Sequence, residues 1–192
     1  MTGASKWGLI EVPLTARGSR RLGDAWHGYI YKKNHTRFEQ PKLLVPAIAT
    51  GSCFTLDREG HFYFVGSGGG GGGYGITPRS DSRVSELYLL ALLNSRLLDY
   101  MLHQVSTPFR GGYLALNRQY IEVLPIRPIN FADPAERAEH DALVALAERI
   151  LAAKRTDSAA DTSALEREID DRVFHLYALT PEEIGLVQGG TP

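Results

Sequence analysis

The chain has 192 residues, of which 43% are hydrophobic and 22% charged, so it can form a packed core and wholesale disorder is excluded. No stretch of about 18 residues lacks charge, and no basic head precedes an apolar run at the N-terminus, so the sequence predicts neither a membrane span nor a secretory signal. The net charge of −1 hides an asymmetry, because residues 1–127 hold 15 Lys and Arg against 9 Asp and Glu, whereas residues 128–192 hold 6 against 13. The basic part suggests a polyanionic partner, although chance clustering on solvated faces gives the same numbers.

The N-terminal part of the chain predicts strands. Residues 1–25 are polar and contain glycine, which indicates a linker or an edge segment with a strand around 9–14. Aromatic and polar residues alternate over 26–31, as in a half-buried strand. The apolar run 41–49 is interrupted by Pro46 and is too short for a helix, so we expect a buried strand. Residues 54–65 resemble a hairpin that turns at Asp57 to Gly60.

The middle of the chain predicts a flexible loop followed by a long helix. Residues 66–75 are nearly all glycine, and glycine loses the most backbone entropy on ordering. The run lacks the Gly-Lys-Ser/Thr of a phosphate-binding loop, which disfavours nucleotide binding. Leucines at helical spacing predict one amphipathic helix over 84–105. Pro108 and a glycine pair then break the chain, and 120–126 is predicted to be a strand.

The C-terminal part predicts helices. Asp133-Pro-Ala-Glu136 is typical of a helix start, in which the first side chain caps and Glu136 reaches back, and this helix continues to about residue 154. A second helix is expected over 164–176, and Thr180-Pro-Glu-Glu183 forms another capping box. The fold class is therefore α+β, with a central mixed or antiparallel sheet, a crossing amphipathic helix and a C-terminal helical section.

Catalytic and metal-binding patterns find little support in the sequence. The six histidines lack metal-ligand spacing, and no Gly-x-Ser-x-Gly turn is present. Cys53 is the only cysteine and lies in an apolar neighbourhood, so it forms no internal disulfide and is predicted to be a buried thiol. Asp170 and Asp171 are predicted on a solvated helix face. A reducing cytoplasm fits this composition.

Five segments occur in an order that carries a family resemblance. Gln40-Pro-Lys42 precedes an apolar strand, the 54–64 hairpin follows, and Tyr88-Leu-Leu-Ala-Leu-Leu-Asn-Ser-Arg96 forms a helix. Gly111-Gly-Tyr113 together with Leu124-Pro-Ile126 forms the fourth segment, and 169–184 is the fifth. This order, over about 26–187, resembles the TaqI-like C-terminal specificity domain, or target recognition domain, of type IIG restriction-modification enzymes and adenine-N6 DNA methyltransferases.

The resemblance implies a module that reads double-stranded DNA for a catalytic domain. In the family, the catalytic domain has a Rossmann-like fold, an Asn-Pro-Pro-Tyr motif and a glycine-rich loop for S-adenosylmethionine. This sequence has neither motif, so we expect no catalytic residue and no cofactor here, and S-adenosylmethionine in the missing domain. The expected organisation is a linker or edge segment at 1–25, a target recognition core at 26–130 and a helical section at 131–192. By itself the chain is not expected to be an enzyme, but a fragment or subunit of a site-specific methyltransferase or type II restriction enzyme.

The candidate DNA contacts are polar residues in loops beside the resembling segments, because lysine and arginine neutralise phosphates, arginine reads guanine and asparagine reads adenine. They are Lys32, Lys33, Arg37, Lys42, Tyr74, Arg79, Arg83, Arg110, Asn117 and Arg118. Two other functions stay open. The acidic helices 133–187 would dock a methyltransferase or nuclease subunit in a protein-interaction module, which includes a part of a type I specificity subunit. A small enzyme that binds a nucleotide through the glycine run is the third alternative.

Overall fold

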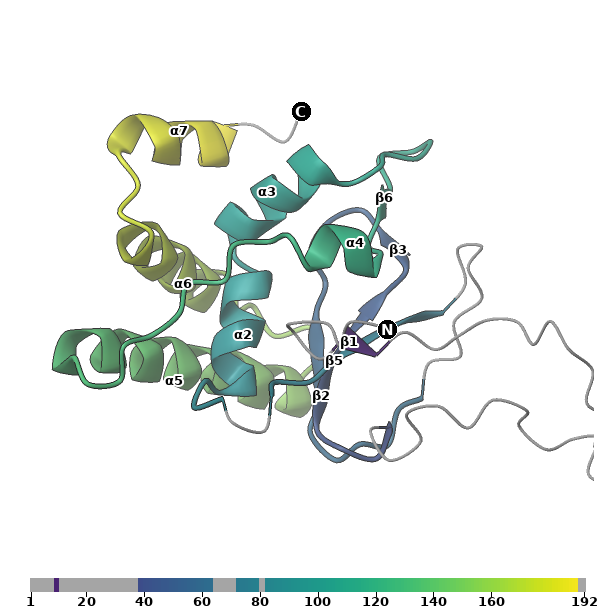
Figure 1. Ribbon diagram of the computed structural model, residues 1–192, viewed down its shortest axis with the longest axis horizontal. Helices are drawn as coiled ribbons and strands as arrows, with labels where there is room; N and C mark the ends of the chain where they lie inside the picture. Colours follow the sequence, from purple (N-terminus) through teal and green to yellow (C-terminus); the bar gives the residue numbers. More distant parts are fainter. Residues whose placement is uncertain (1–8, 11–37, 64–71, 80–81, 190–192) are drawn as a thin grey trace, which may run out of the picture.

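The computed structural model describes residues 9–10, 38–63, 72–79 and 82–189 (Figure 1). The predicted strand at 26–31 lies outside these residues. So do three of the candidate contacts, Lys32, Lys33 and Arg37.

The main sheet is antiparallel throughout its described strands. Its four strands are ordered β1 (Leu9–Ile10), β5 (Gly73–Ile76), β2 (Lys42–Pro46) and β4 (Thr55–Asp57). Leu43 in β2 lies opposite Ile76 on one side and Leu56 on the other. Because β2 has a strand on either side and its first four residues are buried, its sequence is continuously apolar after Lys42.

The predicted strand at 41–49 divides between two sheets. After β2, the short strand β3 (Ile48–Ala49) pairs with β6 (Leu114–Ala115). Pro46 has no amide hydrogen to extend the ladder. The next residue, Ala47, donates to the Gly72 carbonyl at 2.9 Å and accepts from the Leu116 amide at 2.8 Å, so the chain passes from one sheet to the other there.

The predictions for 54–65 and 66–75 were wrong in part. β4 pairs with the preceding β2, and residues 61–63 form no strand, because the Asp57 carboxylate accepts hydrogen bonds from the amides of His61 and Phe62 at 3.0 Å each. The end of the glycine run is strand β5 rather than loop. At Gly73 a Cβ atom would lie 2.3 Å from the Val45 carbonyl oxygen, so close strand packing requires glycine.

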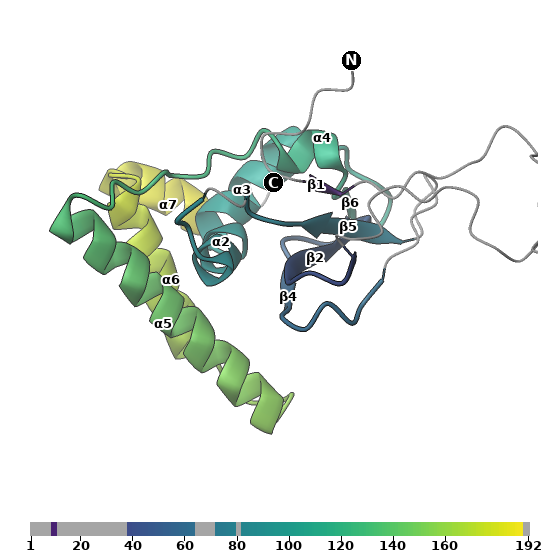
Figure 2. The ribbon, with the colours of Figure 1, turned by 60° about the horizontal axis from the view of Figure 1, so that its bottom comes forward.

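The predicted helix at 84–105 is two helices, α2 (Glu86–Leu93) and α3 (Arg96–Val105). Between them the Ser95 hydroxyl donates to the Leu92 carbonyl at 2.7 Å and accepts from the Leu98 amide at 3.4 Å, which ends one helix and starts the next. α2 is buried on all sides, so only α3 is amphipathic. The sheet lies on one side of α2, and the C-terminal helices lie on the other (Figure 2).

The predicted strand at 120–126 was also wrong. Helix α4 (Arg118–Ile121) occupies its first part. The backbone beyond it bonds to tyrosines instead of a neighbouring strand. The Tyr88 hydroxyl donates to the Arg127 carbonyl at 2.8 Å, while the Tyr177 hydroxyl donates to the Pro125 carbonyl and accepts from the Arg127 amide at 3.0 Å.

The C-terminal helical section is confirmed as α5 (Pro134–Thr156), α6 (Ser163–Leu176) and α7 (Pro181–Gly189). The reciprocal capping box of Thr180 and Glu183 forms as predicted. Glu136, however, accepts from the Asn130 amide and from Arg127, so the first box is incomplete. α5 packs on α2 and α6, and one hydrophobic core includes residues of the sheet and of these helices. No helix in the described ranges is both long and apolar enough to cross a membrane.

Candidate nucleic-acid interface

A β-hairpin at 107–115 follows α3 directly. The Phe109 amide donates to the Tyr113 carbonyl at 2.6 Å, and the Ala115 amide donates to the Thr107 carbonyl at 3.1 Å. Both glycines at the tip, Gly111 and Gly112, have positive φ values of 85° and 78°, which favour glycine. This 107–115 hairpin projects from the side of the molecule opposite α5 and α6 (Figure 1).

The tip of the 107–115 hairpin is exposed and combines aromatic rings with a positive charge. Phe109 is 47% exposed, Tyr113 is 46% exposed, and Arg110 between them is also exposed. A guanidinium can bind a phosphate or the edge of a guanine, and aromatic rings can contact sugars and bases. The tip therefore offers both charge and apolar contact to a nucleic acid.

The base of the same hairpin is buried in the protein. Leu114 and Ala115 are buried and pair with β3. The Ser106 hydroxyl donates to the Ala115 carbonyl at 2.9 Å, and the hydroxyls of Thr107 and Tyr120 share a hydrogen bond. These contacts hold the exposed tip in a defined position relative to α3 and α4.

The structure brings two of the candidate contacts together. The Tyr74 hydroxyl of β5 donates to the Asn117 side-chain oxygen at 3.2 Å, and both residues are half-buried. Nearby in sequence, Arg118 forms an ion pair with Glu122 at 3.0 Å. Tyr74 of β5 therefore contacts the start of α4, at Asn117, close to strand β6 of the hairpin.

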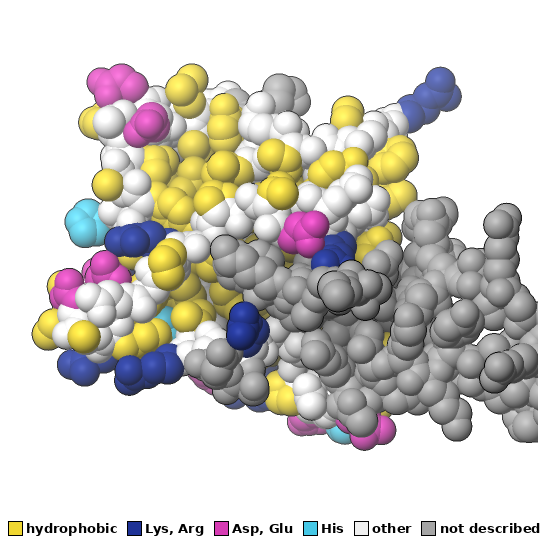
Figure 3. All heavy atoms as spheres, viewed as in Figure 1, with side chains coloured by type: hydrophobic (Ala, Val, Ile, Leu, Met, Phe, Trp, Pro, Cys, Tyr) yellow, Lys and Arg dark blue, Asp and Glu magenta, His cyan; other side chains and the backbone are white. Residues whose placement is uncertain are grey.

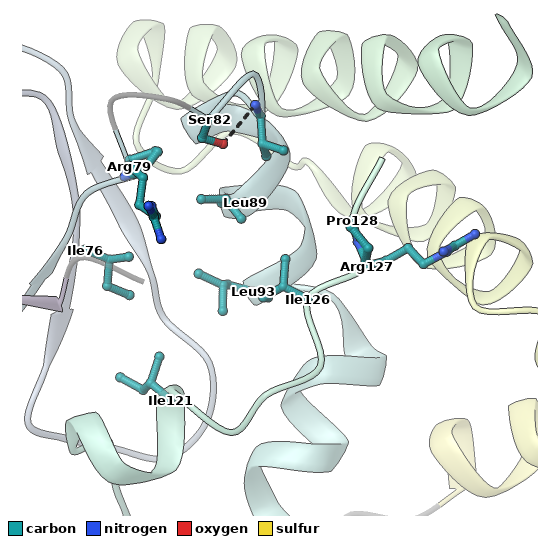
Figure 4. Close-up of a pocket in the computed structure, with 11 residues that line it drawn as sticks. Ile76, Arg79, Ser82, Leu89, Leu93, Ile121, Ile126, Arg127 and Pro128 are labelled. Atoms are coloured by element: carbon teal, nitrogen blue, oxygen red, sulfur yellow. Dashed lines mark hydrogen bonds between the residues drawn. The ribbon is translucent and has the colours of Figure 1, made fainter. Parts of the chain in front are cut away.

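The candidates Arg79 and Arg83 lie elsewhere, beyond β5. Arg79 is exposed and points into an apolar hollow of about 170 Å³, whereas Arg127 at the same hollow points away (Figure 4). Arg83 is also exposed, and its guanidinium lies 5.0 Å from the centre of the Phe131 ring. The lining of the hollow is mainly aliphatic and has no phosphate-binding loop.

Lys42 requires a correction, because it is a buried residue rather than a surface cation. The residue is 1% exposed, and the ammonium donates to the Asp57 carboxylate and to the Phe38 carbonyl, each at 2.5 Å. Burial raises the pKa of Asp57, but the hydrogen bonds from Lys42 and from two backbone amides outweigh this and lower it overall. Lys42 therefore stabilises the fold and has no ammonium to offer to DNA.

Two other predictions of burial were wrong. Cys53 is exposed rather than buried, although partial burial and the nearby Asp99 carboxylate raise the pKa of its thiol. Asp170 is buried rather than solvated, and its carboxylate accepts from the Arg96 amide at 2.8 Å. Burial raises the pKa of Asp170 despite this bond.

Sequence reasoning missed three exposed aromatic residues. Phe109 lies at the hairpin tip, while Phe62 and Tyr63, which are 67% and 55% exposed, follow the turn that Asp57 holds. The signal that could have indicated them was a large apolar side chain next to a glycine-containing turn. Aromatic residues in such a position are, however, usually interpreted as part of the core. Among the described residues, no group of three or more His, Cys, Asp or Glu is placed to bind a metal ion.

Comparison with known proteins identifies a family for most of the sheet and for the 107–115 hairpin. The TaqI-like C-terminal specificity domain family matches residues 24–126. The chain belongs to this family. It is also 31% identical over 102 residues to the type II restriction enzyme and methyltransferase RM.Eco57I of Escherichia coli. That match covers 53% of this chain but only 10% of the relative.

The family match divides the described elements into two groups. β2 to α4, with the 107–115 hairpin, lie inside residues 24–126, and β1 and α5 to α7 lie outside them. The aromatic and cationic tip is thus part of the specificity domain itself.

Proposed function

We propose that the chain is a sequence-specific DNA recognition module of a restriction-modification adenine-N6 methyltransferase or endonuclease. The exposed hairpin tip, with Arg110 between Phe109 and Tyr113, is the observation that carries the proposal. Membership of a specificity-domain family and the likeness to a restriction enzyme and methyltransferase support it. A module with this function is expected to work in the cytoplasm.

In the proposed complex, the 107–115 hairpin enters a groove of the duplex. Arg110 then reads a base edge or a phosphate, and the two flanking rings contact the groove wall. Asn117 has an amide that suits adenine, while Arg79 and Arg83 suit phosphates. The candidates Lys32, Lys33 and Arg37, which lie outside the described residues, would add further phosphate contacts.

The chemistry is assigned to a partner. We infer that this chain has no catalytic site, and that a methyltransferase domain or subunit supplies S-adenosylmethionine and takes the target adenine out of the duplex. The acidic helical section, with 13 Asp and Glu against 6 Lys and Arg over 128–192, would lie away from the DNA.

Selection from a pool of random duplexes, at low and moderate salt, tests the proposal. The wild-type chain should enrich a motif. Arg110→Gln should lose preference at one base pair, by about 1–3 kcal/mol if the contact is bidentate. Arg149→Gln is the matched control, since Arg149 is an exposed arginine on α5 and its replacement removes the same charge. Uniform binding that disappears with salt would contradict base readout and leave phosphate contacts alone.

The second candidate function is a protein-interaction module, in which the helical section docks a methyltransferase or nuclease subunit. It is favoured by α7, where Leu186 is 64% exposed beside the exposed acids Glu182 and Glu183. Figure 3 also shows hydrophobic side chains gathered over α3 between α7 and α4. Capture of a catalytic subunit without DNA, together with no enriched motif, would put this function first.

A further inference from the structure

Helix α3 connects the 107–115 hairpin to a junction at which three distant parts of the chain meet. Just before α3, the Asn94 side chain exchanges two hydrogen bonds of 2.9 Å with the backbone of Phe54. Within its first turn, Asp99 accepts from the Ser52 amide at 2.6 Å. These contacts fasten the start of α3 to the segment between β3 and β4.

The third contact at the junction comes from the C-terminal helical section. Asp170 of α6 accepts from the Arg96 amide at 2.8 Å, and its second oxygen lies 3.4 Å from the Arg96 guanidinium. Arg96 is the first residue of α3, so a carboxylate 74 residues away caps the helix that supports the hairpin. This places a negative charge at the positive end of the helix dipole.

The burial of Asp170 argues that the contact has more than a stabilising role. Its side chain is 12% exposed, and burial, Asp171 and Glu166 all raise its pKa, against the opposing effect of the Arg96 amide and guanidinium. An ionised carboxylate in this place is therefore less stable than in water. A neutral acceptor would cap the helix with a smaller penalty from burial.

The length of α3 converts a small change at its start into a large change at the hairpin. α3 has ten residues, so it is about 15 Å long, and a tilt of about 10° at its start moves its far end by about 3 Å. Hydrogen bonds to base edges weaken steeply outside their usual distance range, so such a shift would break them. Readout at the tip thus depends on how the start of α3 is held.

We propose that Asp170 is a positioning residue for DNA readout. By capping α3 from α6, it sets the direction of the helix and so the position at which the 107–115 hairpin meets the bases. The inference rests on the proposed function, because it concerns the regulation of the same reading tip. It makes the helical section, which lies outside the matched family domain, a determinant of specificity.

The test compares Asp170→Ala and Asp170→Asn in the full chain, with Asp171→Asn as the matched control. Asp171 is the exposed neighbour of the same charge on the same helix. Binding is measured on a duplex enriched by the wild-type chain and on a scrambled duplex of equal composition. We expect Asp170→Ala to lower the ratio of the two affinities about tenfold, Asp170→Asn to lower it less, and Asp171→Asn to leave it unchanged.

A second measurement separates positioning from simple stabilisation. Backbone amide hydrogen exchange should become faster at Phe109 and Ala115 of the hairpin in Asp170→Ala, but stay unchanged in α5. An equal loss of affinity on both duplexes, or faster exchange spread evenly over the whole chain, would overturn the proposal. If the wild-type chain enriches no motif, the proposed function fails, and hairpin exchange alone tests the role of Asp170. Should Asp170→Ala fail to fold, the affinity ratio and the hairpin exchange of Asp170→Asn take its place in both comparisons.

Discussion

Replacing Lys42 with methionine decides between a structural lysine and a DNA-contacting one. Methionine keeps most of the side-chain volume but removes the ammonium that binds Asp57 and the Phe38 carbonyl. Asp57, which is 3% exposed, then keeps only the hydrogen bonds from the His61 and Phe62 amides. The substitution therefore leaves a buried carboxylate without its counter-ion.

The magnitude follows from this geometry. Removing one partner of a buried ion pair destabilises a fold by about 3–5 kcal/mol. For a domain of this size, about 1 kcal/mol corresponds to about 2–4 °C, so we expect the midpoint of thermal unfolding to fall by about 10 °C. Arg58→Met is the control, because its pair with Glu148 is about half exposed on both sides and is worth less than about 1 kcal/mol.

The assay combines thermal unfolding with DNA binding as a function of salt concentration. We expect Lys42→Met to unfold earlier yet, at a temperature where it is folded, to keep the wild-type DNA affinity and salt slope. An unchanged unfolding midpoint with a salt slope smaller by about one would refute the reasoning, because that result belongs to a lysine on a phosphate.

Four further substitutions test other parts of the fold. Asn94→Ala should lower the free energy of unfolding by about 1–3 kcal/mol, measured by urea titration, because the Phe54 backbone loses two partners. Gly112→Ala should lower the free energy of unfolding by about 1 kcal/mol, because φ is 78° there but a Cβ would meet no atom within 4 Å. Gly60→Ala should lower it clearly more, because its Cβ would lie 2.3 Å from the Glu39 backbone. Equal losses in the two variants would contradict this reasoning. The Asp170→Asn variant should become more stable relative to wild type as the pH rises from about 4 to 7. The pKa of Asp170 is raised above 3.8, so its ionisation in this range destabilises the wild-type fold. A difference in unfolding free energy that does not change with pH would count against this reasoning.

Local sequence patterns were sufficient to predict an element wherever its structure depends on residues that are close in sequence. The helices α5, α6 and α7 were predicted because their apolar spacing, caps and boundaries all lie within a few residues. The fold class was predicted for the same reason, and the order of five short segments indicated the family that residues 24–126 match. The exposed Arg110 was found because a glycine pair marks a turn in any context.

Tertiary contacts decided what the sequence alone left ambiguous. Lys42 looked like a surface cation because its partner Asp57 is 15 residues away and is only brought close by strand pairing. Residues 120–126 resembled a strand because apolar and polar side chains alternate there, and this pattern cannot show whether a partner strand lies beside them. Gly73 was predicted to be in a loop but lies in strand β5, because the backbone of β2 pairs with it. The amino-acid sequence alone therefore determined the fold class and the C-terminal helices, and the order of its segments indicated the family. Burial, ion pairing and the position of the 107–115 hairpin were decided by tertiary structure, because each depends on groups that are distant in sequence.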